Sequence, residues 1–388
     1  MKVLFATVEG GLTGGANIAS MNLMTELVQR GVEVHAAVLG GELKDALEGK
    51  GIICHEVRHI PFFKWPRIKR NDIRSLLLWP ARLFAYPLWN LQSARRVARI
   101  IKEIRPDFVE SCNSPAVYGY FASRKTGIPH IWHLREYLGK NVRIDIMPSN
   151  RYLMRHWLPK SYTIAVSEDV GRFFGCTDPG KDFVVTDGVF HESEAPRYIA
   201  GKEGYFLYVG LLVPTKGCDD LINAFILYAK RHPEFSLWLA GAYEEPYLNR
   251  LRDTIRASGI DENRVKFLGF RKDRYDLMAK AQATIVPSPL EAFGFITVEA
   301  IMNGSIVIGR DTGGTHAIMQ DCPGCSLPFD TTEQMAARME EVLNKGALSF
   351  SDGVAESQEH ARNKYTIERC GAEVAAVYEK IKESHAES

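Results

Sequence analysis

Two series of short apolar segments, each alternating with amphipathic helical segments, constrain the fold of this chain most. The first series runs from KVLFATV at residue 2 to DFVVTDG at residue 182, and the second from YFLYVG at residue 205 to SIVIGRD at residue 305. Strands that alternate with helices build parallel sheets with helices on both faces. The sequence therefore predicts an α/β fold of two doubly wound, Rossmann-like domains that face a central cleft.

The polar stretch HESEAPRYIAGKEG separates the two series and marks the predicted boundary. A chain of 388 residues is also long for a single hydrophobic core. We expect a first domain over 1–190, a hinge over 191–203 and a second domain over 204–365. A helix over 366–388 follows, with the option of crossing back to the first domain.

Composition narrows the cellular setting. The net charge of +1 gives no overall field that would attract nucleic acid. There is no apolar run of about 18 residues that would span a membrane, and the first residues do not resemble a signal peptide. The odd number of cysteines, seven, is typical of reduced cytoplasmic thiols. Cys322 and Cys325 form a C-x-x-C without the second pair that a zinc site needs, so we expect a surface turn and no metal site.

A glycine-rich loop, GGLTGGA at residues 10–16, follows the first predicted strand and opens a helix. Amide groups at a helix N-terminus suit an anion. The dinucleotide fingerprint G-x-G-x-x-G and the phosphate loop G-x-x-x-x-G-K-[ST] are both absent, which argues against hydride transfer and ordinary P-loop chemistry. Tight turning of the backbone is the alternative reason for these glycines.

The second series places charged residues at the ends of its strands. LLVPTKG follows YFLYVG, so Lys216 can reach a phosphate, although a solvated loop lysine is the alternative. PLEAFGF follows the strand ATIVPS, where Gly294 would let the backbone approach a ligand. Glu291 could face the hydroxyls of a sugar, and Glu299 could accept both hydroxyls of a ribose. The alternative is that one glutamate caps the turn and the other is solvated on a helix.

These residues carry a resemblance to a known family. VGLLVPTKG and PSPLEAFGFITVEAIMNGSIVIGRDTGGTHAIM, with seven residues between the two glutamates, resemble the retaining glycosyltransferases of family 4, which have the GT-B fold. VKFLGF, VSEDV and YTIERCGAEVAAVYEKI also stand where that family would place them. In the first half, GGLTGGANIASMNLMTEL resembles the family's opening loop and helix. CNSPAVYGYFASRKTGIPHIWHLREYLG resembles the subgroup that acts on polysaccharides and cell-surface glycans.

The resemblance implies a role for each matching residue. Lys216 would bind the donor diphosphate, Glu299 the ribose, and Glu291 the transferred sugar. The backbone amides of Phe293, Gly294 and Phe295 would contact the diphosphate and the sugar. Gly15 would lie near the phosphates, His133 would contact the donor sugar, and Phe270 and Arg271 would border the base. Arg135 and Glu136 would lie near the acceptor. Lys216, Glu291 and His133 would thus serve catalysis. The implied substrates are a nucleotide-diphosphate sugar and a glycan or lipid-linked acceptor, with no cofactor.

Two positions depart from the family pattern. Leu211 stands where the family commonly has an arginine, so one diphosphate partner is missing. Arg271 or Arg310 compensates, or the donor differs, or activity is weak. Asp187 stands where the family often has asparagine. A nucleotide-sugar 2-epimerase of the same fold and a non-catalytic accessory protein are therefore alternatives to a transferase.

Residues 58–105 are strongly basic and rich in aromatic side chains. The basic residues are Arg58, Lys64, Arg67, Lys69, Arg70, Arg74, Arg82, Arg95, Arg96, Arg99, Lys102 and Arg105; the aromatic ones are Phe62, Phe63, Trp65, Trp79, Phe84, Tyr86 and Trp89. Aromatic and basic side chains together suit a membrane interface. We expect this segment to dock on anionic lipid at the inner face of the membrane. The alternative is a core-facing helix with solvated arginines.

Overall fold

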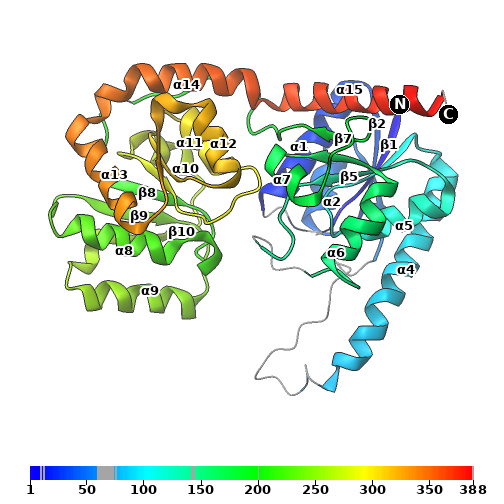
Figure 1. The fold of residues 1–388 in the computed structure, drawn as a ribbon, viewed down its shortest axis with the longest axis horizontal. Helices are drawn as coiled ribbons and strands as arrows, with labels where there is room; N and C mark the ends of the chain where they lie inside the picture. The colour runs from blue at the N-terminus through cyan, green and yellow to red at the C-terminus, as the bar shows by residue number, and fades with distance from the viewer. Residues whose placement is uncertain are drawn as a thin grey trace. The chain divides into compact units, whose positions relative to one another are not determined.

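A computed structural model describes residues 1–8, 11, 14–58, 74, 77–140, 145–199 and 201–386. The chain divides into two compact units. The first comprises Met1–Gly188 together with Ile367–Ser388, and the second comprises Val189–Thr366. The predicted hinge at 191–203 therefore falls inside the second unit, and the last helix groups with the first (Figure 1).

The first unit is built around a parallel sheet in the order β3-β2-β1-β4-β5-β6-β7. Its strands are β1 (Lys2–Ala6), β2 (Glu33–Val38), β3 (Ile53–Glu56), β4 (Phe108–Ser111), β5 (His130–Leu134), β6 (Tyr162–Ala165) and β7 (Asp182–Val184). Its helices are α1 (Gly15–Gln29), α2 (Glu42–Glu48), α4 (Trp79–Ile104), α5 (Val117–Thr126), α6 (Asn150–Tyr152), which continues through Leu153–Trp157 and Leu158–Lys160, α7 (Glu168–Phe174) and α15 (Ile367–Ala386).

Both faces of this sheet are covered. Helices α1 and α15 pack on one face, where Leu23, Leu27, Val374 and Tyr378 are buried against strand residues. Helices α4 and α5 pack on the other face. The amphipathic sequence of α15 thus completes the core of the first unit, although almost 180 residues separate it from the rest of that unit.

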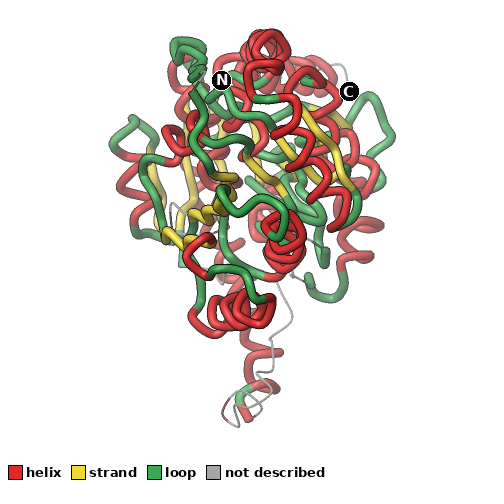
Figure 2. Tube along the Cα trace, turned by 90° about the vertical axis from the view of Figure 1, so that its left-hand side faces the viewer, coloured by secondary structure: helices red, strands yellow, loops and turns green. Residues whose placement is uncertain are grey.

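The second unit repeats this architecture with the strand order β10-β9-β8-β11-β12-β13, again all parallel. Its strands are β8 (Tyr205–Val209), β9 (Ser236–Ala240), β10 (Val265–Gly269), β11 (Thr284–Val286), β12 (Val307–Arg310) and β13 (Ser326–Phe329). Its helices are α8 (Cys218–Ala229), α9 (Glu245–Ser258), α10 (Arg274–Lys280), α11 (Phe295–Met302), α12 (Gly313–Asp321), α13 (Thr332–Lys345) and α14 (Ser351–Lys364), with short 3₁₀ turns at Pro214–Lys216, Glu262–Arg264, Pro323–Cys325 and Ala347–Phe350. Figure 1 shows the sheet between α8 and α9 on one face and α10 to α12 on the other, and Figure 2 shows the strands between helical layers from the side.

The predicted fold class is confirmed, since each unit is a parallel sheet covered on both faces by helices. Two edge strands were not predicted. β3 has the mixed sequence ICHE, whose residues are partly or fully exposed, and β13 has the sequence SLPF. Both lie at the edge of their sheets, where an exposed face and a proline are tolerated and the apolar signal is weak.

The expected surface turn at Cys322 and Cys325 is wrong, because both thiols are buried. The segment packs against α14 so closely that a Cβ on Gly324 would come within 2.5 Å of the Cα of Gly353. Burial raises the pKa of the Cys322 thiol to about 12 and that of Cys325 to about 11. Both thiols therefore stay protonated, and they fill the core.

Candidate functional site

The strand order of the second unit places its candidate site. β8 and β11 are neighbours, although their connections lead to opposite sides of the sheet. In open α/β sheets ligands bind beyond the carboxyl ends of the strands at such a switch point. The loop after β8 ends with Lys216, and the loop after β11 contains Glu291. Nζ of Lys216 lies 2.6 Å from Oε1 of Glu291, so the structure brings these two predicted residues together.

Glycines allow these loops to pack closely. Gly217, just after Lys216, has φ of 74°, and a Cβ there would lie 2.2 Å from the carbonyl oxygen of Pro287 in the loop after β11. Gly294 has φ of 108° and precedes the first residue of α11. A side chain at either position would strain the backbone or separate the loops. Gly294 therefore has a backbone conformation that favours glycine, and its approach to a ligand stays a prediction.

Glu299 lies on α11 and is held by residues that the sequence did not single out. Its Oε1 accepts hydrogen bonds from Nη2 of Arg274 at 2.9 Å and from the hydroxyl of Tyr275 at 3.2 Å. Its Oε2 accepts from Nε of Arg274 at 3.3 Å. Burial, together with the Glu299 carboxylate, raises the pKa of Tyr275 to about 12, so the phenol remains a donor. The carboxylate is thus fixed by α10, and the helical sequence RYDLMAKAQ carried no signal of that role.

The other predicted donor contacts of the second unit differ in exposure. Phe270, just after β10, is 73% exposed. Arg271 pairs with Asp273, with Nη2 2.5 Å from Oδ2. Phe293 is buried, with its ring 5.1 Å from that of Phe295 and 5.8 Å from that of Tyr365. Its side chain therefore belongs to the core, which leaves only its backbone for a ligand.

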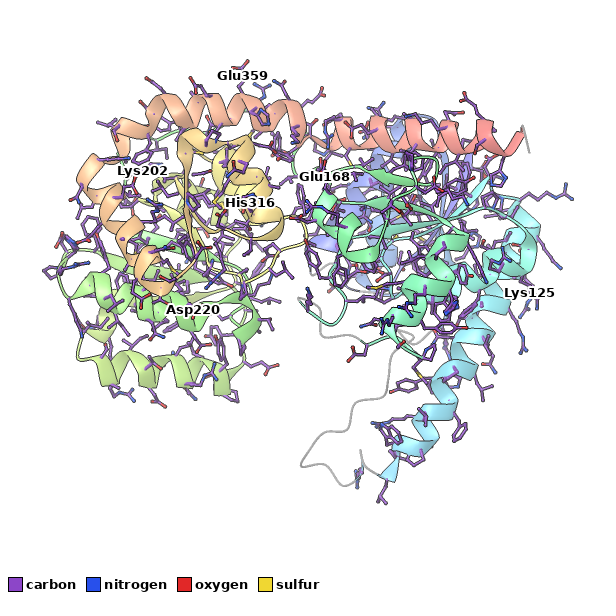
Figure 3. The ribbon with its side chains drawn as sticks, viewed as in Figure 1. Lys125, Glu168, Lys202, Asp220, His316 and Glu359 are labelled. Carbon is purple, nitrogen blue, oxygen red and sulfur yellow. The ribbon has the colours of Figure 1, made fainter. Side chains whose placement is uncertain are left out.

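Arg271 and Arg310, the two arginines that could compensate for Leu211, both have partners within the second unit, and their compensation at the diphosphate stays a prediction. Leu211 is 56% exposed. The three guanidinium nitrogens of Arg310 donate to the carbonyls of Pro287 and Asp330 and to the carboxylate of Asp220, which Figure 3 labels. Arg310 therefore holds loops together, and Arg271 faces Asp273.

His133 is the penultimate residue of β5 inside the first unit and is fully buried. Its Nδ1 lies 2.9 Å from Oε1 of Glu110, whose Oε2 accepts from the hydroxyl of Tyr378 on α15. Its Nε2 has no hydrogen-bond partner and lies 4.0 Å from Oδ1 of Asp187. Burial and the Arg135 charge lower the pKa of His133, which favours the neutral ring with the proton on Nδ1. Its role at the donor sugar stays a prediction.

Arg135 and Glu136, the predicted acceptor residues, are also buried. Nε of Arg135 donates to both carboxylate oxygens of Asp187, at 3.1 and 3.2 Å, and Nη1 donates to the carbonyl of Cys112 at 2.8 Å. Glu136 accepts from the backbone amide of Ser114 at 2.9 Å and from its hydroxyl. Burial raises the pKa of Glu136. The departure at Asp187 therefore has a structural reason, since its carboxylate neutralises a buried guanidinium.

Gly15 is the first residue of α1, and so lies at a helix N-terminus rather than in the loop where we expected it. It is exposed, and the preceding Gly14 has φ of 105°. Its expected contact with phosphate stays a prediction. Residues 9–10 and 12–13 of the glycine-rich loop lie outside the described residues.

Of the basic and aromatic segment 58–105, the structure describes Arg58, Arg74 and residues 77–105. Outside the described residues lie Phe62, Phe63, Lys64, Trp65, Arg67, Lys69 and Arg70. The second half of α4 buries Val97, Ala98 and Ile101. Its first half instead exposes large apolar side chains, namely Leu77 and Leu78 just before it and Phe84, Leu88, Trp89 and Leu91 within it. In Figures 1 and 2 this half reaches away from the sheet of the first unit.

Among the described residues, no group of three or more His, Cys, Asp and Glu side chains is arranged to hold a metal ion. No helix within the described ranges has both the length and the apolar character needed to cross a membrane.

Comparisons with known proteins cover both units. The family model described as Glycosyl transferases group 1 matches residues 190–364, and the one described as Glycosyltransferase Family 4 matches residues 13–177. An uncharacterized glycosyltransferase of Methanocaldococcus jannaschii is 24% identical over 386 residues, which is 98% of this chain and 99% of that protein. The lipopolysaccharide core biosynthesis mannosyltransferase LpcC of Rhizobium leguminosarum bv. viciae is 24% identical over 56% of this chain and 64% of its own length.

Other relatives match over a smaller part of the chain. This chain covers only 40% of a mannosylfructose-phosphate synthase of Agrobacterium fabrum and 53% of a D-inositol 3-phosphate glycosyltransferase of Jonesia denitrificans. Among solved structures, HepE of Anabaena in complex with UDP and glucose aligns with a TM-score of 0.73 at 20% identity, over 97% of this chain and 98% of that one. With both halves matched by family models and the whole chain matched in fold, the chain belongs to the group 1 glycosyltransferases and has the GT-B fold.

Proposed function

We propose that the protein is a retaining glycosyltransferase that moves a sugar from a nucleotide-diphosphate sugar to a glycan or lipid-linked acceptor in the synthesis of cell-surface polysaccharide. The Lys216–Glu291 pair at the switch point of the second unit carries the proposal. It joins a cation suited to a phosphate and a carboxylate suited to sugar hydroxyls. The UDP and glucose bound by HepE and the mannosyltransferase activity named for LpcC support the donor and acceptor classes.

The proposed chemistry depends on the leaving group. As the glycosidic bond breaks, negative charge builds on the departing diphosphate. Lys216 and the amides at the start of α11 would stabilise that charge without a metal ion or cofactor. Glu291 would bind the transferred sugar and Glu299 the ribose. A departing phosphate oxygen would take the proton of the acceptor on the same face of the sugar, which retains the anomeric configuration.

A panel of nucleotide-diphosphate sugars, followed by NMR without an acceptor, tests this function. We expect slow hydrolysis of one donor to a free sugar of retained configuration, because water replaces the acceptor at the same face. An isomerised nucleotide sugar would instead identify a 2-epimerase. Failure to bind any donor would identify a non-catalytic accessory protein. The panel also identifies the base and the sugar.

We further propose that the first half of α4 docks on anionic lipid and presents a lipid-linked acceptor. Phe84, Leu88 and Trp89 are 71%, 59% and 53% exposed, so this part of the helix offers apolar side chains to its surroundings. Exposed arginines follow on the same helix at positions 95, 96 and 99. Apolar residues that enter the interface and basic residues that face anionic headgroups would act together there.

Co-sedimentation with liposomes tests the docking. Binding should need anionic lipid and fall in high salt, because each basic residue near the surface contributes about 1 kcal/mol through a screened interaction. Replacing Arg95, Arg96 and Arg99 together with glutamate should weaken binding about a hundredfold or more. Charge reversal at Arg252 and Arg256 on α9 is the matched control and should change little. Binding that is insensitive to salt, or absent with every lipid mixture, would favour a soluble acceptor.

A further inference from the structure

Arg274 and Tyr275 hold the carboxylate that is assigned to the ribose, and they lie on a different helix from it. The guanidinium of Arg274 reaches both oxygens of Glu299 through Nη2 and Nε, as a two-pronged fork. The hydroxyl of Tyr275 adds a third donor. The Arg274 guanidinium carbon also lies 4.4 Å from the centre of the Tyr275 ring, so the two side chains brace each other.

The carboxylate keeps room for a ligand. Glu299 is 11% exposed and Arg274 30% exposed in their side chains, so the pair is partly buried and still accessible. A carboxylate has about four acceptor positions, and the three hydrogen bonds from Arg274 and Tyr275 leave about one of them open, on Oε2.

A hollow of about 330 Å³ lies beside this pair, within the second unit. Tyr275 and Glu299 line one part of it, and the segment 189–190 and 194–197 lines another. Its volume is at the lower end of the range of small-molecule sites. The braced carboxylate therefore borders a space that a small polar group can enter.

From this geometry we infer that Arg274 and Tyr275 are positioning residues of the donor site, which orient Glu299 toward the ribose hydroxyls of the nucleotide. The inference rests on the proposed function, because it takes the donor to be a ribonucleotide. A glutamate on a helix surface otherwise samples several rotamers, and the arginine fork removes that freedom before the ligand arrives. Lysine at position 274 would supply a charge without the fork.

The predicted readout is discrimination between ribose and deoxyribose. Because hydrogen bonds to a charged group are strong, the wild-type protein should bind its nucleoside diphosphate about tenfold or more tightly than the 2′-deoxy analogue. Arg274→Gln should reduce that preference several-fold through weaker binding of the ribonucleotide, with little change for the deoxy analogue. Arg274→Lys should recover part of the preference, and Tyr275→Phe should show a smaller loss of the same kind.

Isothermal titration with UDP, GDP, ADP and their 2′-deoxy forms measures these ratios. The control Lys280→Gln removes a charge from the far end of the same helix, where Lys280 faces Glu203, and should leave the preference unchanged. Glu299→Gln tests the role of Glu299 at the ribose separately from the positioning role of Arg274. If it keeps the wild-type preference, the assignment of Glu299 to ribose in the proposed function is wrong.

If Glu299→Gln abolishes the preference but Arg274→Gln retains it, Arg274 is only a surface partner and the inference fails. Equal weakening of the ribo and deoxy forms by Arg274→Gln would place Arg274 on the phosphates instead, and would also overturn the inference. Circular dichroism and thermal unfolding of each variant check that the overall fold is retained.

Discussion

Replacing Lys216 with alanine is expected to weaken binding of the preferred nucleoside diphosphate by about 1.5–3 kcal/mol, the range for a hydrogen bond to a charged group. Lys216 is the cation at the switch point, and the residue at position 211, where the resemblance leads one to expect an arginine, is leucine. Its side chain is 35% exposed and so can reach a ligand. Glu299→Ala should also weaken binding. Equal affinities for wild type and for both variants, measured by titration calorimetry, would refute the site assignment.

Replacing Glu291, the partner of Lys216, should have the opposite effect on the affinity for the nucleoside diphosphate. Nζ of Lys216 donates a hydrogen bond to Oε1 of Glu291 at 2.6 Å. A diphosphate therefore has to compete with that carboxylate for the ammonium group. Glu291→Gln should therefore bind the bare nucleoside diphosphate as well as wild type or a few-fold more tightly, since partly exposed ion pairs contribute up to about 1 kcal/mol. Sugar transfer by the same variant should fall much further than binding, because the proposed contact to the sugar is lost.

The double variant Lys216→Ala/Glu291→Gln serves as the control for this competition. Without the ammonium group the gain from Glu291→Gln should disappear, and the double variant should bind like Lys216→Ala alone. A loss of nucleotide affinity in Glu291→Gln comparable to that in Lys216→Ala would contradict the exchange and place Glu291 on the nucleotide itself.

Local sequence predicted the strands and helices of the second unit well, together with the two loops that bring Lys216 and Glu291 together. Strands with continuous apolar runs alternate there with amphipathic helices, and the two site loops follow β8 and β11 directly. The order of strands then brings Lys216 and Glu291 together, because the ends of adjacent parallel strands lie at one edge of the sheet. The pairing thus follows from a topology that repeated helix–strand alternation already implied.

Contacts between distant parts of the chain could not be predicted in the same way. Arg274 and Glu299 are 25 positions apart on separate helices, and Arg135 and Asp187 are 52 apart. Nothing in the local pattern distinguishes a charged residue that braces another from one that is solvated. The buried partners of His133, Arg135 and Glu136 were likewise not predicted, because the roles of these residues came from the resemblance alone and their partners are distant in sequence.

Asp187→Ala is expected to lower the free energy of unfolding of the first unit by about 3–5 kcal/mol. Both side chains of the Arg135–Asp187 pair are 2% exposed, so removal of the carboxylate leaves a buried guanidinium without its counter-charge. Urea unfolding followed by tryptophan fluorescence reports the change, because Trp132 lies in the core of this unit, next to His133. Asp169→Ala removes a partly exposed carboxylate that pairs with the exposed Arg172 and should cost less than about 1 kcal/mol.

Two further variants distinguish the effect of the lost charge from the effect of lost packing. Arg135→Met with Asp187→Leu removes both charges and should recover most of the stability lost in Asp187→Ala, since a buried pair often contributes little over apolar residues of similar volume. Asp187→Asn introduces the residue that the resemblance leads one to expect, and should lose about 1–3 kcal/mol, because a neutral acceptor leaves the charge of Arg135 unbalanced. Wild-type stability in Asp187→Asn would show that Arg135 is neutralised by other groups, such as Glu110. A loss confined to the charge-breaking variants would instead explain why this chain carries aspartate here, since the buried arginine at the end of β5 requires it.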